Sequence, residues 1–110
     1  MKTEQPILIT SIVASANLAK NLFVGFNGML PASDVKALGV VNADSNLGEN
    51  TPVMVQGIAL VYSNIAITQG SAVTTHSNGK AKPISGSEII NGYALDSASG
   101  PDELIRVLLK

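Results

Sequence analysis

Apolar and polar residues alternate over short stretches of this chain, and Gly or Pro interrupts the pattern about every ten residues. Alternation with a period of two is typical of β-strands, because successive side chains of a strand point to opposite faces. Ten Gly and five Pro in 110 residues divide the chain into many short predicted strands. That spacing is typical of small β-sandwiches and β-barrels.

The same run of predicted strands and turns occurs twice, about fifty residues apart. Each copy contains an Asn-Gly pair, then a Pro, an apolar stretch with Gly, a further Gly and a last apolar stretch. The pairs that repeat are Asn27-Gly28 with Asn78-Gly79, Gly39 with Gly92, and Gly48 with Gly100. We therefore predict a duplicated β-framework. Both Asn-Gly pairs predict two-residue type I′ hairpin turns, because Asn and Gly tolerate positive φ.

Two segments are ambiguous. The apolar run 53–62 contains Gly57, and we interpret it as two strand pieces joined at a bulge or bend. Residues 101–110 begin with Pro and two acids and end with Lys, which also suits a short helix. The repeat favours a strand, because at an offset of 52 residues this segment aligns with the strand that begins at Pro52. The alignment pairs Val53 with Ile105 and keeps the alternation.

The first 13 residues differ from the rest of the chain. A polar start and Pro6 precede the β-branched stretch 7–13, which carries no charge. We predict an N-terminal arm over residues 1–13 and a single β-rich domain over residues 14–110. Two interpretations of the arm stay open: it is the first strand of the domain, or it adds to a partner's sheet through backbone hydrogen bonds.

Composition and charge narrow the function. Apolar residues make up 45% of the chain and aromatic residues 4%, so the core is built from small aliphatic side chains that suit packed sheets better than a ligand pocket. Charged residues are 14%, against roughly 25% in ordinary globular domains, as expected of a protein packed against other subunits. The basic residues are scattered and the apolar runs are short, so we expect no nucleic acid and no membrane partner.

Few side chains suit chemistry. The chain has no Cys and one His, His76, which precedes a predicted turn and is interpreted as an exposed hairpin residue. Neither metal-ligand spacing nor a nucleophile or phosphate motif occurs, so we expect no cofactor, no metal and no catalytic residue. Asp44 and Asp96 hold corresponding places in the repeat and are interpreted as turn carboxylates that accept backbone N–H groups. Lys80 is interpreted as a solvated lysine that protects the hairpin.

Several segments resemble the small capsid cement, or head decoration, proteins of bacteriophages. The segments that carry the resemblance are 57–62, 67–73, 77–83, 92–99 and 103–109. Together with the repeat, the resemblance implies an all-β fold: a small β-barrel or β-clip-like (β-tulip-type) domain with an internal duplication, little or no helix and an extended N-terminal arm.

The resemblance implies a non-enzymatic structural protein of the virion. Such proteins bind the outer surface of the phage head and cement the major capsid protein lattice, commonly as trimers. The expected partners are thus the major capsid protein and further copies of the chain, and the expected location is the capsid exterior, after assembly in the host cytoplasm. No catalytic motif is carried over. The expected capsid-contacting residues lie in the arm: Pro6, Ile7, Leu8, Ile9 and Ile12.

Two other classes of function stay open. A nucleotide hydrolase on a small β fold would need phosphate-binding groups, but Arg106 is the chain's single arginine and no Gly-rich loop accompanies it. A carrier domain would present a modified Lys80, although the surrounding Asn-Gly-Lys-Ala-Lys differs from the usual Met-Lys-Met or Asp-Lys-Ala. A carbohydrate-binding module would expose aromatic platforms, and the four aromatic residues lie mostly in apolar stretches.

Overall fold

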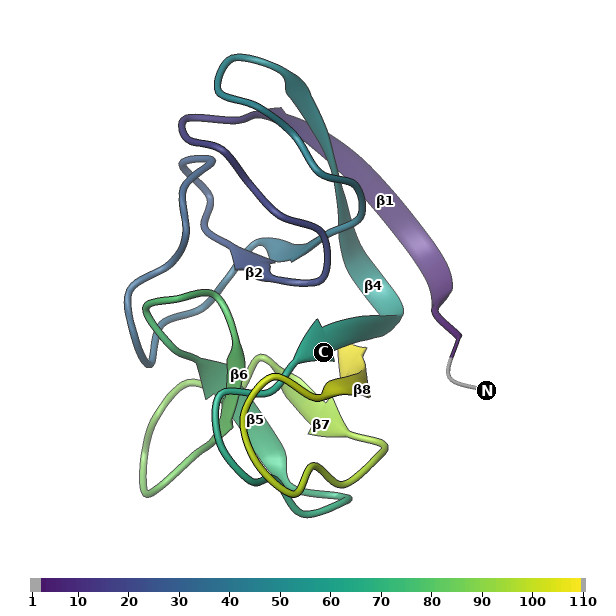
Figure 1. Cartoon of the computed structure of the whole chain (residues 1–110), viewed down its shortest axis with the longest axis vertical. Coiled ribbons are helices and arrows are strands. Elements are labelled where there is room, and N and C mark those ends of the chain that lie inside the picture. Colours follow the sequence, from purple (N-terminus) through teal and green to yellow (C-terminus); the bar gives the residue numbers. More distant parts are fainter. Residues whose placement is uncertain (1–2, 110) are drawn as a thin grey trace.

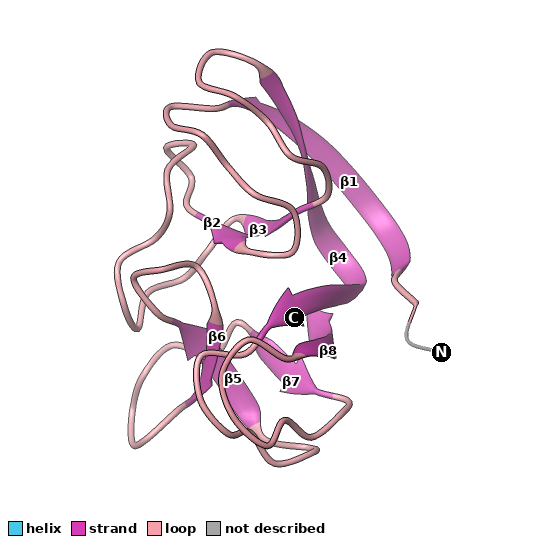
Figure 2. Cartoon of the chain, viewed as in Figure 1, coloured by secondary structure: helices cyan, strands magenta, loops and turns pink. Residues whose placement is uncertain are grey.

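The computed structural model describes residues 3–109, and these consist of strands, turns and loops with no helix (Figure 2). The strands are β1 (Gln5–Val13), β2 (Phe23–Val24), β3 (Gly39–Val41), β4 (Asn50–Tyr62), β5 (Ala72–Thr75), β6 (Ala81–Pro83), β7 (Gly92–Ala94) and β8 (Leu104–Leu109). The all-β prediction is confirmed. Within the same range no helix is long and apolar enough to cross a membrane. Met1, Lys2 and Lys110, which belong to the predicted arm and domain, lie outside the described residues.

The strands form one antiparallel sheet that curls into a nearly closed barrel. Its order is β2-β3-β4-β8-β7-β5-β6, and β1 pairs with β4 beside this path. One edge of the long strand β4 pairs with β1, and the other edge pairs first with β3 and then with β8. Figure 1 shows β1 at the outer margin of the molecule, β2 on the opposite side of β4 from β1, and β5 to β8 below.

The internal duplication is visible in the hydrogen bonds. Leu38 N donates to Val24 O at 2.9 Å in the first half, and Asn91 N donates to Val73 O at 2.8 Å in the second half. β3 pairs with β2 and β4 as β7 pairs with β5 and β8. The ladders make these residues equivalent: Val24 and Val73, Gly39 and Gly92, Val53 and Val107.

The strand β4 belongs to both halves. Its first part is the last strand of the first half, and its second part pairs with β8 as the first strand of the second half. Gly57 lies between these parts with φ 118°, so the predicted bend is there, within one continuous strand. The segment 104–109 is a strand, as predicted. Val53 is matched by Val107 and not by Ile105, and the two-residue difference preserves the alternation that supported the strand prediction.

Both Asn-Gly pairs form hairpin turns, but the predicted type I′ is wrong. Gly28 and Gly79 have φ of 81° and 83°, whereas neither Asn has positive φ. In each turn the Gly N–H donates a hydrogen bond to the backbone carbonyl of the residue three positions earlier. The Asn Oδ1 accepts a hydrogen bond from the backbone N–H of the residue two positions later. This is a type I turn followed by a left-handed Gly, which makes a three-residue hairpin loop. The Asn side chain stabilises that form by satisfying a backbone N–H.

The core consists of two clusters. The larger one joins both halves, because Phe23, Val40 and Met54 of the first half are buried together with residues such as Val73 and Val107 of the second. The smaller one lies under the first half alone and is formed by Ala14, Leu18, Val24, Val41 and Val53. The two faces of the β2-β3-β4 sheet therefore contribute to different cores.

Two of the repeated glycines are required by close packing of neighbouring strands. A Cβ at Gly39 would lie 2.1 Å from Met54 O, and a Cβ at the equivalent Gly92 would lie 2.6 Å from Leu108 O. Both distances are far below a van der Waals contact, so any side chain would push the strands apart. The duplicated glycine thus reflects a duplicated contact.

Candidate interaction surface

The predicted contact residues gather on β1, at the margin of the molecule. Ile7 is 77% exposed, Leu8 52% and Ile9 42%, and Pro6 is exposed as well. Ile12 differs, because it is half-buried and packs against the smaller core cluster. Four of the five predicted residues therefore lie at the surface, while the fifth anchors the strand to the core.

The pairing of β1 with β4 explains this exposure. The strands pair from Gln5 opposite Ile58 to Val13 opposite Asn50, with register shifts on either side of Leu8. At these shifts Ile7 has no partner residue in the ladder, which is the geometry of a bulge that turns a side chain outward. Of the two interpretations of the arm, this pairing agrees with the one in which the arm is the first strand of the chain's own sheet. Its role toward a partner, and the boundary after residue 13, stay predictions.

A second exposed apolar group surrounds the first hairpin turn. Phe26 is 68% exposed, and Met29 and Leu30 are exposed beside it. The turn adjoins the end of β1, since Ser15 N donates to Gly28 O at 3.0 Å. We call Phe26, Met29 and Leu30 the turn patch. Sequence analysis missed it, although three large apolar residues flanking an Asn-Gly turn indicate exposure, because turns lie at the surface.

A third exposed apolar group lies on the second half. Ile89, Ile90 and Tyr93 are each exposed by about a third or more, next to and within β7. Large exposed apolar residues therefore occur on both halves of the molecule.

The two aspartates bind backbone N–H groups, as predicted, but they are not equivalent. Asp44 Oδ1 accepts the N–H of Lys20 at 2.7 Å, and the matching acceptor in the second half is Ser97 Oγ, which accepts the N–H of Gln69 at 2.9 Å. Asp96 instead accepts the N–H of Arg106 at 3.0 Å and binds its guanidinium with both oxygens. This hydrogen bonding raises the pKa of Arg106. The donors come from distant strands and loops rather than from the aspartates' own turns.

The second hairpin is more buried than predicted. Lys80 is half-buried and pairs through Nζ with Asp102, so it is not a free solvated lysine. His76 is half-buried as well, and its Nδ1 accepts the N–H of Asn78 at 3.3 Å. These contacts tie the hairpin to its surroundings, and they give His76 a structural role in the turn.

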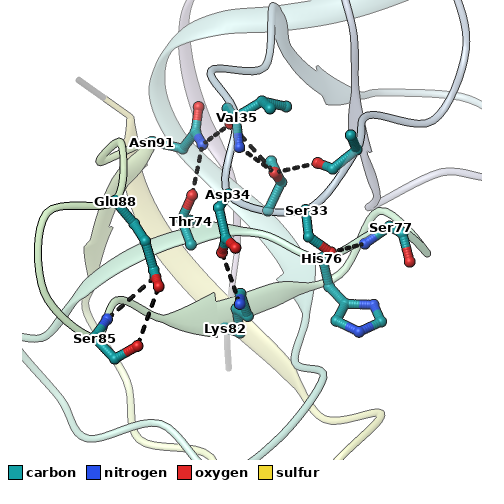
Figure 3. A network of polar contacts seen from close by, with 12 residues as sticks. Ser33, Asp34, Val35, Thr74, His76, Ser77, Lys82, Ser85, Glu88 and Asn91 are labelled. Carbon is teal, nitrogen blue, oxygen red and sulfur yellow. Dashed lines mark hydrogen bonds and ion pairs between the residues drawn. The ribbon is translucent and has the colours of Figure 1, made fainter.

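A polar network fastens the loop before β3 to the second half (Figure 3). The buried side chain of Asn91 accepts the N–H of Ala37 at 2.8 Å and donates to Val35 O at 2.7 Å. Nearby, Lys82 Nζ lies 2.6 Å from Asp34 Oδ1. The hydrogen bond to Asp34 raises the pKa of Lys82 above its ordinary value.

Across residues 3–109 no group of three or more His, Cys, Asp or Glu residues is arranged to hold a metal ion. A shallow pocket of about 310 Å³ lies between Lys20, Tyr62, Lys80 and Asp102, and its lysine and aspartate are already paired with each other.

An all-β frame with exposed apolar residues on its edge strand suits a structural protein. The chain belongs to the phage cement protein family, whose model matches residues 1–109. Its role is therefore structural and associated with the phage capsid, and the family expected from the sequence is confirmed. The hydrolase, carrier and carbohydrate-binding alternatives are not favoured.

A solved structure shows the same fold. The head fiber gp8.5 N base of bacteriophage phi29 is similar with a TM-score of 0.77 and 19% sequence identity, over 94% of this chain and 93% of that chain. No curated protein matches the chain in sequence. The identity is low, so this likeness supports the fold alone.

Proposed function

We propose that the protein binds the outer surface of the phage head, contacts the major capsid protein and cements its lattice. Contact is made through the exposed side of β1, by Pro6, Ile7, Leu8 and Ile9, with Ile12 holding the strand from beneath. The protein acts by binding alone, without catalysis or a cofactor. It joins the shell in the host cytoplasm and remains on the capsid exterior.

The exposure of Ile7, Leu8 and Ile9 is the observation that carries this proposal. Three consecutive large aliphatic side chains at 77%, 52% and 42% exposure are costly in water. Complete burial of a fully exposed side chain of this size contributes about 1.5–3 kcal/mol, so Ile7 can gain most of that amount and Leu8 and Ile9 about half of it. A cement protein of a phage has one evident partner for such a surface, the shell to which its family is bound.

Stabilisation of the lattice follows from mass action. A protein that binds the mature lattice and not the dispersed subunits stabilises the lattice by RT ln(1 + [L]/Kd) at each site. Repetition over the many equivalent sites of a shell multiplies this term. Affinity at a single site can therefore be modest while the shell gains considerable strength.

We also propose that the protein is a homo-trimer. Support comes from two further groups of exposed apolar residues: the turn patch, which adjoins the end of β1 remote from Pro6 to Ile9, and Ile89, Ile90 and Tyr93 on the second half. The low charged fraction of the chain, 14%, favours packing between copies. Analytical ultracentrifugation should give three times the chain mass, and a monomer at micromolar concentration would contradict the trimer without touching the capsid contact.

The test of capsid binding is co-sedimentation with expanded capsids. We expect wild-type protein to sediment with them and a variant with Ile7→Thr, Leu8→Thr and Ile9→Thr to remain in the supernatant. Threonine keeps the β-propensity of the strand, so the fold is retained. Deletion of residues 1–13 is a weaker test, because it also uncovers β4 and removes Ile12 from the core.

The matched control is Leu47→Thr, which removes an exposed leucine from the turn before β4. This variant should bind as well as the wild type. If the wild type fails to sediment with capsids, the cement function is wrong. If the triple variant binds equally well, the cement function stands and β1 is not the contact.

A further inference from the structure

The outer edge of β1 presents backbone groups, in addition to side chains, to a binding partner. In the described part of the chain, β4 is the strand paired with β1, and all of this pairing lies on one edge. Proteins usually protect such an edge with charge, Pro or a bulge. Here Pro6 and the bulge protect the beginning of β1, but residues 9–11 carry neither protection nor charge.

The direction of the backbone groups identifies which of them are free. Ala14 N donates to Glu49 O at 2.9 Å, so the backbone of this residue faces the β4 side. Residues of an antiparallel strand alternate between facing the partner and facing away. Thr10 and Ile12 therefore face β4, and Ile9 and Ser11 direct their N–H and C=O groups toward the open side.

The internal duplication shows what such an edge accommodates in this fold. Met54 and Leu108 hold the same place in the two halves. Ile9 pairs with Met54, and Ile58 pairs with Leu108, so Ile9 and Ile58 are equivalent. Ile58 is paired on both sides, with Leu108 on one edge and with Gln5 on the other, and both pairings are antiparallel. Its equivalent Ile9 has a strand on one edge alone. The frame thus accepts an extended strand at the position that β1 leaves open.

We propose that a short, extended, uncharged segment of the capsid shell protein adds antiparallel to β1 and pairs with the backbone of Ile9 and Ser11. The inference rests on the proposed function and assigns it a mechanism. Backbone hydrogen bonds hold the added strand in register, and the exposed Ile7, Leu8 and Ile9 receive its apolar side chains. β1 then becomes an interior strand of a sheet that two proteins share.

The surroundings of the edge favour a foreign segment over a second copy of the chain. A Cβ on Gly28 would lie 2.4 Å from Val13 O, so the first hairpin turn closes the edge at the end of β1. Two copies of β1 paired about Thr10 would each meet this turn of the other copy. An antiparallel pairing of two β1 strands centred on Ile7 would place both bulges and both Pro6 residues, which lack an N–H, within the new ladder. A short linear segment meets neither obstacle.

Amide hydrogen exchange of the full chain, free and bound to expanded capsids, tests the proposal at single residues. We expect exchange at Ile9 and Ser11 to be fast in the free protein and to slow by at least about tenfold on the capsid, because a bonded amide exchanges through opening of the ladder. Thr10 and Ile12 should be slow in both states. This odd-and-even pattern distinguishes strand addition from general covering of the surface.

The outcomes separate this inference from the proposed function. Capsid binding by co-sedimentation with unchanged exchange at Ile9 and Ser11 overturns strand addition and leaves the cement function intact. Absence of co-sedimentation overturns the cement function itself. Slow exchange that develops with protein concentration, without capsids, assigns the edge to a second copy and overturns the shell segment as its occupant.

A pair of variants gives an independent readout. Ser11→Pro removes the outward N–H at an edge position where Pro is tolerated, and Ser11→Ala removes the side chain and keeps the N–H. We expect the Pro variant to bind capsids about tenfold more weakly at an unchanged melting temperature, and the Ala variant to bind normally. If the folded Pro variant binds capsids as tightly as the wild type, the proposal is wrong. If the Pro variant does not fold, the hydrogen-exchange experiment is the test.

Discussion

At the scale of single residues, Gly57 decides whether β1 and β4 can lie together. A Cβ at this position would lie 2.4 Å from Gln5 O and 2.7 Å from Ile7 N, and φ is 118°. We predict that Gly57→Ala lowers the free energy of unfolding by about 2–4 kcal/mol, since both the backbone conformation and the approach of β1 are lost. Urea denaturation followed by circular dichroism measures this effect.

The matched control is Gly48→Ala. Gly48 also has positive φ, 88°, but a Cβ there would have no atom within 4 Å. This variant should lose only the conformational part, about 1 kcal/mol. Equal losses at the two positions would show that the contact with β1 contributes nothing.

A buried hydroxyl offers a stabilising substitution. Thr51 Oγ1 is fully buried and has no hydrogen-bond partner among residues 3–109. Thr51→Val replaces the hydroxyl by a methyl group of similar size, and we expect the free energy of unfolding to rise by about 1 kcal/mol because an unsatisfied polar group is removed. Thermal and chemical denaturation should agree on the sign.

The same substitution at Thr75 should have the opposite sign. Thr75 Oγ1 donates to Ala32 O at 2.8 Å and accepts the N–H of Val35 at 3.2 Å, and it is also buried. Thr75→Val leaves these groups without their partner and should cost about 1–3 kcal/mol. If both variants shift stability in the same direction, β-propensity rather than hydrogen bonding governs these sites.

At the scale of elements, the loop before β3 depends on residues of the second half. Asn91 holds the backbone of Val35 and Ala37, and Lys82 pairs with Asp34. Nothing in the local sequence of the loop encodes these partners, because they lie some fifty residues away in the chain. Sequence patterns find a turn of this kind but not its attachment.

The ion pair of this loop gives a pH prediction. The pKa of Lys82 is raised above 10.5 in the folded protein, so its stabilising contribution is fully present below that value and is lost as the pH rises through the folded pKa. The stability difference between wild type and Lys82→Met should therefore be constant around neutral pH and disappear in strong alkali. Urea denaturation at a series of pH values measures it.

Lys36 provides the contrast, because desolvation lowers its pKa below 10.5. Its charged form is disfavoured in the fold, so Lys36→Met should not destabilise the protein at neutral pH. Any gain should vanish as the pH rises toward 10.5. A Lys36→Met profile that matches that of Lys82→Met would mean that general charge repulsion, rather than the ion pair, sets the pH dependence.

Strand patterns were largely predictable at this scale, and turn details were not. Alternation and the repeat indicated β8 and the bend at Gly57, because both follow from side-chain periodicity. The type of the hairpin turns depends on a side-chain hydrogen bond from Asn, which the letters Asn-Gly do not reveal. The match of Gly48 with Gly100 was also wrong, since the residue equivalent to Gly48 is Asp102, with φ 62° and the same backbone bond.

The candidate site was predictable in part for a related reason. An uncharged β-branched stretch indicates a strand, but the exposure of Ile7 depends on a bulge that the pairing with β4 creates. Ile12 lies on the opposite face of the same strand and meets the core. The turn patch depends on where the first hairpin lies in the fold, which local patterns do not specify.

At the scale of the whole molecule, the shared core should make the two halves unfold together. Met54 belongs to the first half but is buried with Val73 and Val107 of the second. We predict a single thermal transition whose calorimetric and van't Hoff enthalpies agree. Met54→Ala should lower stability by about 2–5 kcal/mol without splitting that transition.

The control is Leu18→Ala, in the cluster that lies under the first half alone. It should also destabilise the protein while the transition remains single. Two separate transitions in either variant would show that the halves are independent units joined only by β4.

The continuity of β4 has a mechanical consequence. β4 is paired over eight positions with β1 and over six with β8, so a tension applied along β1 is passed into β4 and on to β8 as shear. The hydrogen bonds of an antiparallel ladder lie across the strands, and in shear they carry load simultaneously rather than one after another. One uninterrupted strand thus distributes a pull at the margin of the protein over both halves, which the proposed cement function requires under the outward pressure of a filled head.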